Sequence, residues 1–259
     1  MYSSTLLLPI TKKVPTLMKP KVDLVISINV YKCVNTLRLQ LRSIETHVHC
    51  SYVVILNCNE SFFQVLKRHH FNHPKVVIHP LHFEKKRLHG SLTQGIANNM
   101  IYATMHVNFD YFMVLSGRTI FYRRLFKESL ENAQRKRNAN APNTLYHDPP
   151  PNNVWHWDTF NSTLLSKYYF AKGYTLYSSP HEGMVFSYRS CRILLAFLTH
   201  YPSITANIMN FPFCVEEFAL QTIACNESAD GFFYLGNGCY EECDVTNKAL
   251  YTRKIAFLT

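Results

Sequence analysis

The sequence predicts an α/β domain with a mostly parallel central sheet flanked by helices. Three observations predict it: several apolar runs of strand length, amphipathic helical segments between them, and a chain of 259 residues that is 47% hydrophobic. The apolar runs are continuous rather than alternating, which is typical of strands buried on both faces. A chain of this size can bury a full-sized core. We therefore expect a leader at residues 1–21 and a single domain at residues 22–259.

Strands and helices alternate through the first part of the domain. Strands are expected at residues 22–29, 52–57 and 75–79, and a helix at residues 61–69. The helix after the first strand is marked by Leu37, Leu41 and Ile44 at i, i+4, i+7 spacing. Strand–helix–strand units of this kind form parallel sheets with right-handed crossovers.

A third helix is expected to open at His89-Gly90-Ser91, with Ser91 as its cap, and to run to about His106. It leads to a strand at residues 111–115. The remaining elements are expected to be a loop at 138–153, a strand at 183–187 and helices at 191–200, 215–224 and 246–254.

Ligands of open parallel sheets bind at the carboxyl ends of the strands. The segments that follow the predicted strands should therefore line one crevice. These segments are Asn29-Val30, residues 57–59, residues 79–90 and residues 116–118.

The strand and turn Asp110-Tyr-Phe-Met-Val-Leu-Ser-Gly117 is similar to a segment of the core-2/I-branching N-acetylglucosaminyltransferases and the peptide O-xylosyltransferases, which form glycosyltransferase family 14. Two later segments follow in the family's order. Val215 to Ile223 is similar to the family's Pro-Asp-Glu helix, and Ala249 to Lys254 to its near-terminal Leu-Phe-Ala-Arg-Lys. Glu182 to Arg189 is a looser match to its Gly-Ser-Gln-Trp strand.

This resemblance implies an inverting transfer of GlcNAc or xylose from a UDP-sugar donor to a glycan hydroxyl, on a GT-A fold and without a divalent metal or other cofactor. Residues 22–118 would then be the donor-nucleotide half, and residues 119–259 the acceptor and catalytic half. The matched positions make Glu217 the general base and Lys254 the diphosphate-binding lysine. Two departures are Thr119, where the family has Asp, and Cys214-Val215, which replace its Pro.

The proposed chemistry needs a carboxylate to take the proton from the attacking hydroxyl. Glu217 is our first candidate, and Glu182 is the rival base or an acceptor ligand. Acidic residues in a first helical turn also stabilise the helix dipole in any protein, so Glu216 and Glu217 have a purely structural alternative.

A diphosphate that leaves without a metal must be stabilised by fixed cations. Candidates are Arg253 and Lys254, with Arg118 at the turn where paired metal-binding aspartates are usual. His89 and Ser91, at a helix start, are further donor-side candidates. The run Lys85-Lys86-Arg87 is interpreted as a solvated basic face. Candidate nucleoside contacts are Asn29, Val30 and Asn57.

Trp155 and Trp157 lie in a predicted loop and are candidates for stacking on the acceptor sugar, with plugging of the domain edge as the alternative. The spacing of the histidines and cysteines indicates no metal site. Eight cysteines suit either a reducing cytosol or a lumenal domain with disulfides.

A net charge of +10 and a pI near 9.2 favour anionic partners. They motivate a nucleic-acid-binding alternative, with clusters such as Arg135-Lys136-Arg137, but the basic residues are scattered and we do not expect nucleic acid as a partner. An inactive carbohydrate-binding relative is a third possibility. No apolar run approaches the ~18 residues of a membrane span, and no secretory signal is recognised. We expect a cytoplasmic or virus-encoded soluble protein, with the Golgi lumen as the alternative.

Overall fold

The computed structural model of the protein describes residues 19–30, 32–139, 145–146, 160–237 and 251–254. For residues 137–139, 145–146, 237 and 253–254 it describes the backbone alone. The expected leader falls almost entirely outside the described residues, as do Trp155 and Trp157.

A six-stranded sheet forms the centre of the molecule, in the order β3-β2-β1-β4-β8-β9. The strands are β1 (Lys21–Val30), β2 (Tyr52–Cys58), β3 (Val76–Ile78), β4 (Asn108–Ser116), β8 (Met184–Ser187) and β9 (Phe233–Tyr234). The first four are parallel, whereas β8 and β9 are antiparallel to their neighbours. The prediction of an α/β fold with a mostly parallel sheet is therefore confirmed.

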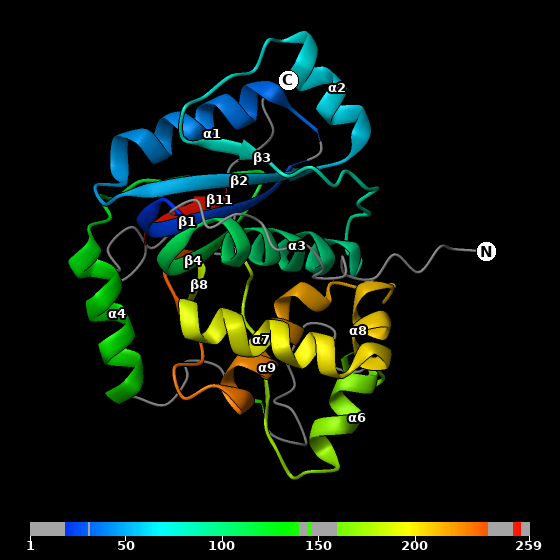
Figure 1. The fold of residues 1–259 in the computed structure, drawn as a ribbon. Helices are drawn as coiled ribbons and strands as arrows, with labels where there is room; N and C mark the ends of the chain where they lie inside the picture. The colour runs from blue at the N-terminus through cyan, green and yellow to red at the C-terminus, as the bar shows by residue number, and fades with distance from the viewer. Residues whose placement is uncertain (1–18, 31, 140–144, 147–159, 238–250, 255–259) are drawn as a thin grey trace.

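Helices cover both faces of this sheet (Figure 1). α1 (Val34–His47) and α2 (Glu60–Arg68) lie on one face, and α3 (Ser91–His106) and α7 (Tyr188–His200) on the other. The expected stripe of Leu37, Leu41 and Ile44 is buried against the first face. Continuous apolar residues on the central strands fill both cores because each strand is covered on both sides.

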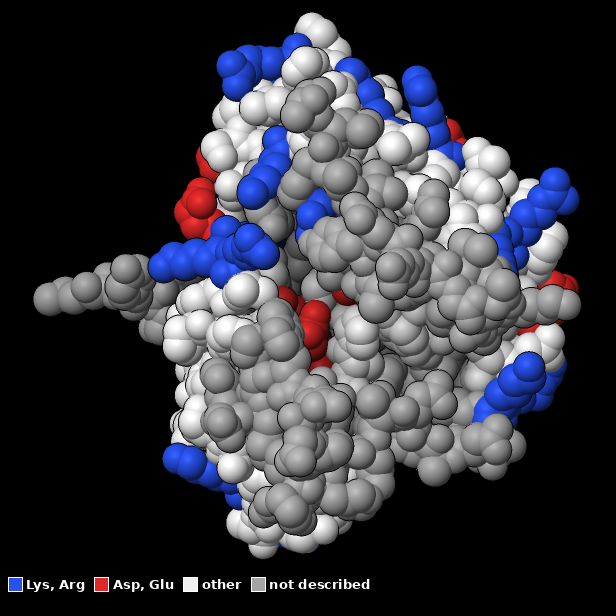
Figure 2. Space-filling view, turned by 180° about the vertical axis from the view of Figure 1, so that it is seen from behind, with Lys and Arg blue, Asp and Glu red and all other residues white. Residues whose placement is uncertain are grey.

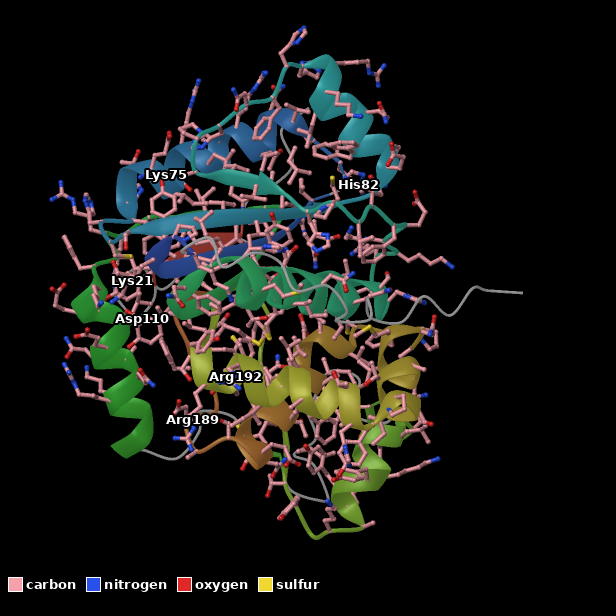
Figure 3. All side chains as sticks on the ribbon, viewed as in Figure 1. Lys21, Lys75, His82, Asp110, Arg189 and Arg192 are labelled. Atoms are coloured by element: carbon pink, nitrogen blue, oxygen red, sulfur yellow. The ribbon has the colours of Figure 1, made fainter. Side chains whose placement is uncertain are left out.

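The chain between β4 and β8 crosses from one side of the sheet to the other. It includes β5 (Thr119–Phe121), α4 (Lys127–Ala139), β6 (Leu145–Tyr146), α6 (Leu164–Phe170) and β7 (Leu176–Tyr177). At the start of α4, Lys127 Nζ lies 2.7 Å from Asp23 Oδ1 and 3.0 Å from Asp110 Oδ2. Asp110 is labelled beside α4 in Figure 3. This double ion pair fixes α4 at the amino-terminal ends of β1 and β4.

Two helix predictions near the end of the chain differ from the structure in part. The expected helix 215–224 is a short 3₁₀ turn, η1 (Val215–Glu217), followed by α9 (Ala219–Glu227). Phe218 separates the two because its φ of −137° is not helical. The expected helix 246–254 has its described end in β11 (Thr252–Lys254), a strand that covers the open edge of β5.

The remaining elements complete the lower part of the molecule in Figure 1 and a small second sheet. α8 (Pro202–Met209) packs against α3, α6 and α7. The second sheet has the order β10-β11-β5, with β10 at Gly236–Asn237. Within the described ranges, no helix combines the length and apolar character that a membrane crossing requires.

Candidate functional site

The carboxyl ends of β1 and β4 meet at a tight backbone contact. A Cβ added to Gly117 would lie 3.0 Å from the Asn29 carbonyl oxygen. Gln40 Nε2 donates a 2.8 Å hydrogen bond to the Ser116 carbonyl and holds the turn from the α1 side. The half-buried Arg118 follows in this turn. The structure therefore brings two of the predicted crevice segments together, at the edge where ligands of parallel sheets bind.

A cluster of ionisable side chains lies where β8 begins beside β4. His181 Nε2 is 3.3 Å from Glu182 Oε1, and His181 Nδ1 is 3.6 Å from Glu217 Oε1. The imidazole thus lies between the two carboxylates that the sequence offered as rival bases. Figure 2, which views the molecule from behind, shows acidic side chains in a hollow near the centre of this face, with basic side chains above them.

Backbone hydrogen bonds fix the cluster from two directions. The Gly183 amide donates to the Val114 carbonyl at 2.7 Å, which anchors the segment to β4. The Ser179 amide donates to the Glu217 carbonyl at 3.0 Å, which anchors it to η1. Gln221 Nε2 then donates to the carbonyls of both Ser179 and Glu216, each at 3.1 Å. His181 is therefore held against Glu217 although 36 residues separate them in sequence (217 − 181 = 36).

Glu216 and Glu217 lie in different environments, as neighbours on a turn of helix should. Glu216 is 2% exposed, whereas the side chain of Glu217 is 22% exposed. Burial raises the pKa of Glu216 to about 7, although the charge of His181 opposes the rise. Glu217 is thus the member of the pair that can reach a ligand from solvent.

His181 is a buried base with acidic neighbours. Burial alone would lower its pKa, but the charges of Glu182, Glu217 and Glu216 outweigh burial and raise it to about 9. At neutral pH the ring is therefore an imidazolium ion, and its positive charge is paired with the neighbouring carboxylates.

Two glycines bring the end of the chain to this cluster. A Cβ on Gly236 would lie 1.8 Å from the Glu182 carbonyl oxygen, and one on Gly183 would lie 2.4 Å from Gly236 Cα. Gly183 also has a φ of +97°, which favours glycine. Gly236 in turn pairs with Thr252 of β11.

The backbone of the two predicted phosphate-binding residues, Arg253 and Lys254, lies in this same corner. In β11, Arg253 pairs with Ile120, and Lys254 pairs with Thr119, the residue after Arg118. Thr119 is fully buried, and its Oγ1 lies 3.0 Å from Ser116 Oγ. The described backbone therefore links the Ser116–Arg118 turn, β11 and the His181 cluster.

The start of α3 differs from the prediction. Ser91 is the first helical residue, the cap position is Gly90, and Ser91 Oγ accepts from the Lys86 amide instead of capping. His89 Nδ1 accepts from the Ser91 amide, and the Gly90 and Leu92 amides donate to other carbonyls. Ser91 is not the cap because it is already the first residue of the helix, and the amides of Gly90, Ser91 and Leu92 are already used within the chain.

The predicted nucleoside contacts lie at neighbouring positions of β1 and β2. Asn29 pairs in register with Asn57, and Val30 with Cys58. Asn29 Nδ2 donates to the Leu92 carbonyl at 2.9 Å and so ties α3 to the sheet. Val30 is 2% exposed and belongs to the core beneath α1. Asn57 is fully buried, and neither of its side-chain amide atoms has a hydrogen-bond partner in the described part of the chain.

Three side chains of the cluster could hold a metal ion. One ligand atom each from His181, Glu182 and Glu217 lie within 4.8 Å of one another. Histidine and carboxylate ligands suit a divalent ion such as zinc. In the present arrangement each imidazole nitrogen faces a different carboxylate, so the ring itself takes the place of a cation. A metal would have to displace the proton on one nitrogen.

No family model matches the chain, and no curated protein matches its sequence. Sequence reasoning missed His181, which carries no motif of its own. Its position directly before Glu182, at the start of a predicted strand, was the only available signal.

Proposed function

We propose that this protein is a GT-A-type glycosyltransferase that moves a sugar, GlcNAc or xylose, from a UDP donor to a glycan hydroxyl with inversion. The observation that supports it best is the meeting of the Glu182–His181–Glu217 cluster with the Ser116–Arg118 turn and β11 at one corner of the sheet. General-base and cationic functions are both needed at the reacting bond, and this corner offers candidates for both.

Glu217 is the proposed general base. Its side chain is 22% exposed and that of Glu182 only 2%, so Glu217 is the one that an acceptor hydroxyl can approach. In the reaction, a carboxylate oxygen of Glu217 takes the hydroxyl proton while the acceptor oxygen bonds to the anomeric carbon. The bond from that carbon to the diphosphate oxygen breaks, and UDP leaves with the bonding electrons.

Glu182 and His181 have supporting roles in this proposal. His181 balances the charge of Glu217 and orients its carboxylate from the buried side. Glu182 holds the other ring nitrogen of His181, in the manner of a carboxylate that orients a catalytic imidazole. The rival assignment makes Glu182 the base, and its burial counts against it.

Cations are proposed to stabilise the leaving diphosphate. Arg118 lies in the turn after β4, and the β11 backbone places Arg253 and Lys254 one strand away from that turn. Fixed cations at the departing oxygen act more strongly in a site that excludes water. Trp155 and Trp157, outside the described residues, remain candidates for the acceptor platform.

Transfer assays with UDP-GlcNAc and UDP-xylose in excess EDTA test the proposal. We expect turnover or slow donor hydrolysis to persist after chelation. Complete loss of both on chelation, with recovery on adding Mn²⁺ or Zn²⁺, would contradict the metal-independent mechanism and assign the His181 cluster to a metal. Binding of glycan without donor turnover would instead indicate the inactive carbohydrate-binding alternative.

The nucleic-acid-binding alternative is less well supported. Among the basic residues, Lys21 lies in β1 and Lys75 directly before β3, whereas Arg189 and Arg192 lie in α7 below them in Figure 3. A nucleic-acid site needs basic residues gathered on one face or groove. The compartment stays a prediction: cytoplasmic or virus-encoded, with the Golgi lumen as the alternative.

A further inference from the structure

We infer that Lys85 binds a phosphate group of an anionic ligand at the carboxyl end of β2, a position that the sequence had assigned to a solvated basic face. The identity of that ligand as a nucleotide rests on the proposed function. The anion site itself rests on the burial and contacts of Lys85.

Lys85 is buried although its neighbours in the basic run are not. It is 7% exposed, whereas Lys86 and Arg87 are exposed. The loop that carries it, between β3 and α3, is fastened at both ends. His82 Nδ1 lies 3.0 Å from Glu60 Oε2 of α2, near the His82 label in Figure 3, and the Gly90 amide donates to the Phe211 carbonyl at 2.9 Å. The inward position of Lys85 is therefore set by the path of an anchored loop.

The ammonium group of Lys85 has little to compensate its charge. Its Nζ lies 3.5 Å from the Phe83 carbonyl oxygen and 4.3 Å from the centre of the Phe83 ring. No carboxylate in the described ranges forms an ion pair with it. A buried cation without a partner is costly, and proteins ordinarily place an anion beside it.

Lys85 lies at the ligand edge of the sheet. It lies in the loop that leaves the carboxyl end of β3, the strand paired with β2, and its charge contributes to lowering the pKa of His79, directly after β3, where burial is the larger cause. Burial lowers the pKa of Lys85 to about 8, although Cys58 and Glu84 oppose the fall. An anion bound here would restore the charged form of the amine.

Asn57 adds a second, independent sign of a ligand at the same edge. It immediately precedes Cys58, is fully buried, and has both Nδ2 and Oδ1 without a partner among the described residues. Buried polar atoms are nearly always hydrogen-bonded in native structures, to protein, water or ligand. Asn57 and Cys58 are successive strand residues whose side chains point to opposite faces of the sheet, so the unsatisfied amide is a separate sign of a polar ligand at the end of β2.

The test compares Lys85→Met with Lys86→Met, which removes the same charge from the exposed neighbouring position. Affinities for UDP, uridine and inorganic pyrophosphate are measured by calorimetry at pH 7. We expect Lys85→Met to weaken UDP and pyrophosphate about ten- to hundredfold, as for loss of a hydrogen bond to a charged group, and to leave uridine within about twofold. Lys86→Met should behave like the unmodified protein.

Two further readouts guard against a merely structural effect. The ligand-free Lys85→Met protein should melt at a higher temperature than the unmodified protein, because a buried charge is removed, and Lys85→Gln provides a second neutral variant. Unmodified protein should also lose pyrophosphate affinity between pH 7 and pH 9, as the amine deprotonates, and the Lys85→Met variant should not.

Equal pyrophosphate and UDP affinities in Lys85→Met and unmodified protein overturn the inference, as does the absence of any pyrophosphate or UDP binding to unmodified protein. Sugar transfer that survives with unchanged UDP affinity in Lys85→Met would leave the proposed function standing without this site. Lys85-dependent anion binding in a protein that transfers no sugar would support the anion site and contradict the proposed function.

Discussion

Two regions of this protein bury charged side chains, and they differ in how the buried charge is compensated. In the cluster around His181, a cation lies between Glu182 and Glu217, so opposite charges are paired within the chain. Around Lys85, a cation is buried without a carboxylate partner in the described ranges. On the proposed function the first region would exchange a proton beside the cations of β11 and the Ser116–Arg118 turn, and on the further inference the second region would bind an anion.

The largest effect is expected from a substitution in the His181 cluster alone. Glu217→Gln should lower the rate of sugar transfer by about 10²–10⁴-fold, because it removes the proposed base. UDP affinity should change less than about threefold, since the anion contacts are left in place. Steady-state transfer assays and calorimetry measure the two quantities. Glu128→Gln, on the exposed side of α4, is the matched control, and an active Glu217→Gln enzyme would move the base to Glu182.

The second effect removes the link between β10 and the His181 cluster. Gly236→Ala should lower the free energy of unfolding by about 3 kcal/mol, because the added methyl group collides with the Glu182 carbonyl oxygen at 1.8 Å. Urea denaturation measures the loss. Gly173→Ala is the control: Gly173 has a φ of +68° and no atom within 4 Å of the added Cβ, so only backbone strain of about 1 kcal/mol is expected. A smaller loss for Gly236→Ala than for Gly173→Ala would mean that the contact relaxes freely.

The smallest effect concerns the protonation of His181. Its pKa of about 9 lies above the ordinary 6.5, so its ion pairs contribute fully to stability below about pH 6.5 and lose that contribution as pH rises through 9. Transfer should fall about tenfold per pH unit above pH 9 if the imidazolium orients Glu217. His181→Asn should abolish this alkaline limb, even if its rate at pH 7 is lower.

A substitution in a surface ion pair is the control that separates this effect from a general response to alkaline pH. His73→Asn breaks a histidine–carboxylate pair with Glu45, whose side chain is 52% exposed. That variant should keep the alkaline limb unchanged. Persistence of the limb in His181→Asn would show that another group titrates there, and the positioning role of His181 would be wrong.

The sequence predicted the long strands and β8 of the central sheet well and the short strands β9, β10 and β11 poorly. β1, β2 and β4 are covered on both faces, so they consist of long, continuous apolar runs that can be recognised in the sequence. β9, β10 and β11 have only two or three residues each, too few for any periodicity, and they form because they pair with strands far away in the chain. The helix expected at residues 215–224 is interrupted because the backbone of Phe218 is not helical.

The candidate site was predicted in part for similar reasons. Glu217 and Glu182 were named from residue type and resemblance, and tertiary packing placed both against a histidine that no pattern distinguished. Lys85 lies in a Lys-Lys-Arg run that is typical of solvated surface, and its burial depends on the anchored path of the loop. The charge of a residue is visible in a sequence, whereas its partners are decided by the fold.

The pairing of β11 with β5 has a consequence for the order in which the molecule assembles. Residues 119–121 can pair only after residues 252–254 are present. This strand pairing joins segments that lie more than half the chain apart in sequence. Such a contact carries a large loop-closure entropy and forms late. On the ribosome, the parallel strands can associate early, whereas this corner can close only after β11 has emerged. A nascent chain that stops before β11 would therefore hold the parallel sheet while the second sheet is still missing its central strand.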